Sequence, residues 1–155
     1  MSEVEKSFNK LRKKYGLPPL KRLMMEFGIK PETPELVLHE TTEKILEKVS
    51  STAKILESVI FISTGSLPSQ LYEANMIKDK KDEVFKLYKK LMQTYWSGEG
   101  ALLSGDEKEI SQFINRVFHE WTGKIKKELM SICELFQKEW KDAKLRESKD
   151  FMYHG

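Results

Sequence analysis

The chain has 155 residues, which suits one domain that buries a hydrophobic core without disulfides or structural metals. Its single cysteine excludes an intramolecular disulfide, and 27 Lys and Arg against 24 Asp and Glu leave a formal net charge of only +3. The longest purely apolar run, residues 59–62, is too short to span a bilayer, and the N-terminal residues lack the apolar stretch of a signal peptide. We therefore expect a cytoplasmic protein without a membrane partner.

The N-terminal region is predicted to form two helices separated by prolines. The first runs from about residue 2 to residue 15 and ends at Gly16, a residue type favoured just after a helix. Pro18 and Pro19 break the chain and begin a short second helix, which ends near Phe27 before Gly28.

A long helix is predicted to follow, because Thr33 and Pro34 form a typical helix start. It extends to about Ile62, roughly 40 Å at 1.5 Å per residue, and is the longest predicted element. Apolar side chains at spacings of three and four predict its buried stripe, which comprises Leu38, Thr42, Ile45, Val49, Ala53, Leu56 and Ile60.

The second half of the chain also has helical periodicity. A turn over 64–68 and a short helix over 68–76 precede Asp79, which is predicted to cap a second long helix. Gly98 and Gly100 leave two alternatives for its end, because the helix either stops near residue 97 or continues to about residue 103.

Gly105 and Asp106 are predicted to stop this helix and start the next one. The last two predicted helices cover 107–121 and 123–146, and Thr122 and Gly123 either separate them or kink one long helix. The predicted fold is an all-α, single-domain bundle of about five to seven helices with one long central helix. It covers residues 1–147, and residues 148–155 are predicted to form a flexible C-terminal tail.

Three short runs of the sequence form a pattern: Leu-Arg-Lys-Lys-Tyr-Gly-Leu-Pro-Pro at 11–19, Leu-Tyr-Glu at 71–73 and Leu-Tyr-Lys-Lys-Leu-Met at 87–92. This pattern resembles a group of small helical archaeal proteins. The resemblance covers about half of the chain. It implies a helical fold and brings with it no activity, cofactor or catalytic residue.

No set of residues has the spacing of a metal or cofactor site. Di-iron bundles require Glu-x-x-His pairs, and neither His39 nor His119 has a Glu three residues before it. Glu35, His39 and Glu43 could share one helix face, but a polar flank of the long helix explains them better. We expect no bound metal, no cofactor and no small-molecule ligand.

Two reactive side chains fall on predicted apolar stripes. Cys133 lies between Leu129 and Phe136, and we expect it to be a buried, inert thiol. Glu99 would lie on an apolar stripe if its helix continued past Gly98, but we favour a loop at this position. Neither residue points to catalysis, so an enzyme is not the favoured interpretation.

Our first hypothesis is a non-enzymatic helical interaction or scaffold protein whose partner is a second copy of itself or another protein. Its basis is a set of apolar residues that fall off the core stripes and are therefore candidate interface positions: Leu36, Phe61, Trp96, Met130 and Leu145. The alternative is a nucleic-acid-associated module that uses the basic N-terminal face. Its candidate contacts are Lys6, Lys10, Arg12, Lys13, Lys14, Lys21 and Arg22. Nucleic acid is our second choice, because the stacking aromatics and glycines of the common RNA-binding modules are missing.

Overall fold

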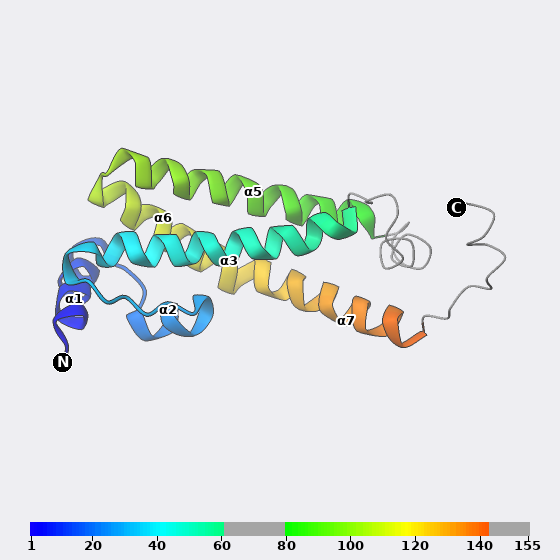
Figure 1. Ribbon diagram of the computed structural model, residues 1–155, viewed down its shortest axis with the longest axis horizontal. Helices are drawn as coiled ribbons and strands as arrows, with labels where there is room; N and C mark the ends of the chain where they lie inside the picture. Colours follow the sequence, from blue (N-terminus) through cyan, green and yellow to red (C-terminus); the bar gives the residue numbers. More distant parts are fainter. Residues whose placement is uncertain (61–79, 143–155) are drawn as a thin grey trace.

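The structure is a computed structural model that describes residues 1–60 and 80–142. Every regular element in these residues is a helix, as the sequence predicts, and together they form one all-α domain (Figure 1). The elements are α1 (Glu3–Tyr15), α2 (Leu20–Phe27), the 3₁₀ turn η1 (Pro34–Leu36), α3 (Val37–Ile60), α5 (Lys81–Ser104), α6 (Glu107–Glu120), the π-helical turn η2 (Trp121–Ile125) and α7 (Lys126–Asp142). The predicted turn at 64–68, helix at 68–76, Asp79 cap and C-terminal tail lie outside the described residues.

Local backbone chemistry sets several helix ends at the predicted places. The Ser2 hydroxyl accepts a hydrogen bond from the Glu5 amide at 3.1 Å and caps α1, and Gly16 ends it with a φ of 67°. Gly105 ends α5 with a φ of 65°, and the Asp106 carboxylate accepts from the Lys108 amide at 2.8 Å to start α6. A positive φ is strained for residues with a Cβ, so glycine is the natural stop at both positions.

The start of α3 differs in detail from the prediction. The Thr33 side chain does not cap the backbone. Instead, the Glu40 carboxylate reaches back and accepts hydrogen bonds from the Glu32 amide at 2.6 Å and the Thr33 amide at 3.1 Å. These two backbone donors, Glu32 first, hold the pKa of Glu40 below its ordinary value of 4.5 because they favour the charged carboxylate.

Helix α3 is central, and α1, α2, α5 and α6 all pack against it. All seven residues of its predicted stripe are buried, and Ile45 and Val49 are fully inaccessible. The core continues across α5 and α6 through Leu91, Ile110 and Ile114. Thr42 is accommodated in this apolar setting because its hydroxyl donates to the Leu38 carbonyl at 2.8 Å.

The favoured loop at Glu99 is wrong, because α5 continues through both glycines to Ser104. Gly98 lies where three helices meet: a Cβ built there would overlap the Cδ2 atom of Leu46 and approach Cζ of Phe113 to 2.6 Å. Glycine therefore permits close packing at this position instead of breaking the helix. Glu99 is half-buried on this helix, and its charge raises the pKa of Tyr95 one turn earlier.

The last two predicted helices form one kinked rod rather than two separate helices. The π-helical turn η2 joins α6 to α7, and Trp121 and Ile125 on this turn are buried. Helix α7 then diverges from α3 and α5 towards its C-terminal end (Figure 1). It contains no buried residue, although its sequence is amphipathic. This divergence creates the surfaces considered next.

Candidate interaction surfaces

The basic residues predicted to contact nucleic acid are all exposed on α1 and α2. Several of them already contact the protein itself. Lys6 pairs with Glu3 at 3.4 Å and Lys14 with Glu107 at 3.5 Å, while the Arg12 Nε donates to the Leu17 carbonyl at 3.2 Å. These contacts compete with any phosphate for the same charged groups.

The remaining basic residues are more loosely held. The Arg22 guanidinium lies 4.9 Å from the centre of the Phe118 ring, which fixes it against α6. Lys10, Lys13 and Lys21 make no ion pair with any residue in the described ranges. Of the basic face that the sequence predicts, only these three lysines therefore have no ion pair, aromatic contact or side-chain hydrogen bond with a described residue.

The predicted interface residues that the structure describes are exposed and lie on three different elements. The exposed fractions are 49% for Leu36, 66% for Trp96 and 57% for Met130. They lie on η1, α5 and α7, respectively. Phe61 and Leu145 lie outside the described residues.

Helix α7 departs most clearly from the sequence-based prediction. Cys133 was expected to be buried, but it is exposed, so the prediction of a core thiol is wrong. The physical reason is the divergence of α7, which leaves Leu129, Ile132 and Leu135 only half-buried. Helical periodicity correctly identified an apolar face, but it could not show whether another helix covers that face.

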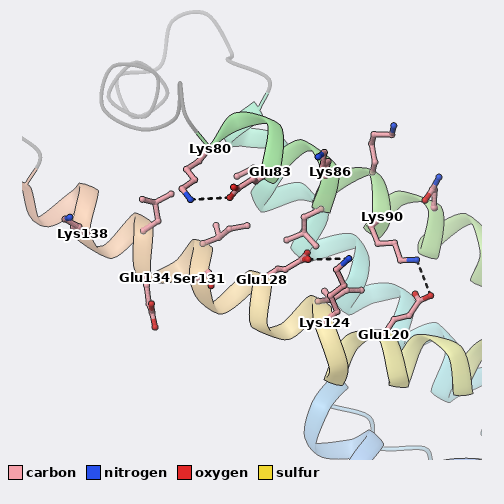
Figure 2. A pocket seen from close by; sticks show the side chains of 17 residues that line it. Lys80, Glu83, Lys86, Lys90, Glu120, Lys124, Glu128, Ser131, Glu134 and Lys138 are labelled. Atoms are coloured by element: carbon pink, nitrogen blue, oxygen red, sulfur yellow. Dashed lines mark hydrogen bonds and ion pairs between the residues drawn. The ribbon is translucent and has the colours of Figure 1, made fainter.

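A groove of about 1010 Å³ separates the N-terminal half of α5 from α7 (Figure 2). Its apolar lining comes from both walls and comprises Val84, Leu87, Ile125, Ile132 and Leu135. The α7 wall extends from position 124 to position 138, a length of roughly 20 Å at 1.5 Å per residue. This length and an apolar floor are typical of grooves that receive an amphipathic helix.

Charged side chains line the rim of the groove (Figure 2). Lys90 on α5 reaches Glu120 on α6 at 3.1 Å and closes one end of the groove. Lys124 and Glu128 pair along the α7 wall at 3.9 Å, and Lys80 and Glu83 pair along the α5 wall at 3.4 Å. Exposed ion pairs of this kind contribute little free energy, so a partner's charges can exchange with them readily.

The sequence reasoning did not identify this groove. A readable signal existed in the row Lys124, Glu128, Ser131, Leu135 and Lys138, whose members are spaced by four and three and so share a helix face. Leu135 is the only large apolar residue in this row, so apolar periodicity alone does not identify the row as part of a groove.

The polar and metal candidates remain dispersed in the structure. Glu35 and Glu43 are exposed and His39 is half-buried along the start of α3. Within residues 1–60 and 80–142, no three His, Cys, Asp or Glu side chains are grouped closely enough to hold a metal ion. No helix in the same residues has both the length and the hydrophobicity needed to cross a membrane.

Comparisons with protein-family models, curated proteins and solved structures found no match to this chain. The candidate surfaces are therefore interpreted from their own geometry and chemistry.

Proposed function

We propose that the protein is a non-enzymatic, cytoplasmic helical interaction protein that associates with itself through α7. The observation that carries this proposal is that the 17-residue α7 buries none of its residues in the described fold, although it carries an apolar face. Covering such a face with another apolar surface is favourable, at roughly 25 cal/mol for each Å² of apolar surface removed from water.

The groove supplies a place where that burial can occur. Leu135 and Ile132 are half-buried on its α7 wall, and the charged rim can give a partner a defined orientation. Trp96 and Met130 remain alternative contact positions because both are more than half exposed. Neither of them lines the groove.

The test is the sedimentation mass of the purified chain over a range of concentrations. We expect a monomer–dimer equilibrium, because the groove of each chain can bind one second copy. Leu135→Ser should shift the equilibrium towards monomer, whereas Leu103→Ser should not, since Leu103 is 86% exposed on α5 and lies outside the groove. A wild-type chain that is monomeric at every concentration would contradict self-association.

Two further variants locate the interface if association is observed. Trp96→Ser and Met130→Ser should leave the mass unchanged if the groove is used. Loss of association in either of them, with Leu135→Ser unaffected, would move the interface to the outer face of α5 or α7.

A nucleic-acid-associated module remains our second candidate. It is favoured by the exposed side chains of Lys10 and Lys13, which have no ion-pair partner among the described residues. Binding there should weaken steeply as salt is raised, because each neutralised phosphate releases counterions. Tight low-salt binding of RNA or DNA that is lost in Lys10→Glu/Lys13→Glu, by a chain that sediments as a monomer, would reverse our ranking.

A further inference from the structure

The α7 wall of the groove carries a carboxylate and an ammonium group on one helix face, ten residues apart. Glu128 and Lys138 both line the groove, and Ser131 and Leu135 lie between them on the same face. Glu128 and Lys138 are equally far along the helix from position 133, as are Ser131 and Leu135. Glu128 therefore lies before the centre and Lys138 after it, with the uncharged Ser131 and Leu135 between them, and Lys124 and Glu134 also line the groove.

A row of this kind is complementary to itself when reversed. If two copies of α7 run antiparallel about a two-fold axis at position 133, Glu128 of each copy lies opposite Lys138 of the other. Ser131 then lies opposite Leu135, so a small side chain faces a large one at the centre. We propose, building on the self-association proposed above, that the groove binds a second copy of this chain through such antiparallel α7–α7 pairing.

The charge order favours this geometry over its alternatives. A parallel pair in register would place Glu128 against Glu128 and Lys138 against Lys138, and like charges at an interface oppose association. An antiparallel pair forms the opposite-charge contact between Glu128 and Lys138 twice, because a two-fold interface repeats each contact. Lys124 on the turn η2 and Asp142 at the end of α7 are also equidistant from position 133 and would form a further opposite-charge contact.

The existing contacts of these residues do not prevent the pairing. Among residues 1–60 and 80–142, the ion-pair partner of Glu128 is Lys124, at 3.9 Å, and the Lys124 side chain is 81% exposed. Lys138 and Ser131 are exposed, and Leu135 is half-buried, so all three have accessible surface. Pairing would cover Leu135, which provides the apolar part of the interface, whereas the neighbouring Ile132 lies opposite Glu134 of the second copy in this register.

A charge-swap experiment tests the pairing in the full chain. The dimer dissociation constant is measured by sedimentation equilibrium for Glu128→Lys, for Lys138→Glu and for the double variant that carries both changes. Each single variant should raise the dissociation constant by about tenfold or more, because it converts two attractive contacts per dimer into repulsive ones. The double variant should return to within about threefold of wild type, because the opposite-charge contacts are restored with reversed polarity.

Lys54→Glu is the matched control, since it makes the same charge change as Lys138→Glu at an exposed position on α3 outside the groove. It should leave the dissociation constant unchanged, and circular dichroism should show that all the variants keep their helix content. Restoration in the double variant supports a second copy as the occupant, because only self-pairing puts both changes into one contact.

The remaining outcomes separate the two proposals. A wild-type dimer whose dissociation constant is insensitive to both single changes would overturn the antiparallel pairing and leave self-association intact. A dimer weakened by each single change but not restored by the double change would also overturn it. A wild-type chain that is monomeric throughout would overturn self-association itself.

Discussion

Replacing Gly98 by Ala should destabilise the protein, although the same change normally strengthens a helix. The added Cβ would overlap the Cδ2 atom of Leu46 and lie 2.6 Å from Cζ of Phe113, well inside the 3.4–4 Å of ordinary contact. Both neighbours are buried, with exposed fractions of 4% and 1%, so neither side chain can move away into solvent. Relief requires either that Leu46 and Phe113 repack within the core or that α5 moves away from α3 and α6.

The magnitude follows from two opposing terms. Overpacking of a dense core costs about 1–3 kcal/mol, and the change from glycine to alanine in a helix interior gains about 1 kcal/mol. We expect a net loss of up to about 2 kcal/mol in the free energy of unfolding. For a chain of this length, this corresponds to a fall in Tm of about 2–4 °C for each kcal/mol.

Gly100→Ala is the matched control, because Gly100 lies in the same helix and no atom lies within 4 Å of the Cβ that would be added. It should stabilise the protein by about 0.5–1 kcal/mol. Urea unfolding followed by circular dichroism measures both variants. Equal stabilisation by the two changes would refute the close approach of α5 to α3 and α6 at Gly98.

Three further predictions follow from the described contacts. Val49→Ala and Leu56→Ala should each lower the free energy of unfolding by about 2–4 kcal/mol in chemical denaturation, since both side chains are almost fully inaccessible, and losses below about 0.5 kcal/mol at both would mean that α3 is not central. Because the pKa of Glu40 is lowered in the folded state, its contribution is present above the ordinary pKa of 4.5 and is lost as the pH falls through the folded-state value. Glu40→Gln should therefore flatten the acid side of the stability profile, and an unchanged profile would argue against its backbone contacts. Asp106→Ala should cost about 1 kcal/mol by removing the cap of α6, and thermal unfolding at neutral pH provides the comparison.

The sequence alone was sufficient for features that depend on neighbours a few residues away. The glycine stops at Gly16 and Gly105 and the helix start at Asp106 all involve backbone groups within one turn. The period of α3 also predicted its buried face correctly, because a long helix in the middle of a bundle has neighbours along its whole length.

The candidate surfaces were less predictable because exposure depends on which helices meet. The sequence correctly indicated that Trp96, Met130 and Leu36 fall outside the core, but it could not show that they lie apart on separate elements. Apolar periodicity predicted that Cys133 is buried, because this residue shares a helix stripe with Leu129 and Phe136. Its exposure follows from the direction of α7, which is set by the π-helical turn and the packing of Trp121 and Ile125.

The region around Gly98 shows the same division between local and tertiary control. Local propensity favours a helix end here, because each glycine in a helix interior costs about 1 kcal/mol relative to alanine. Only the tertiary structure brings Leu46 and Phe113 to the space that a side chain would occupy, and burial of these two residues offsets the local cost. Helix ends and buried stripes could therefore be inferred from the sequence, whereas the continuation of α5, the path of α7 and the groove between them required the packed structure, because they arise from contacts between residues distant in the chain.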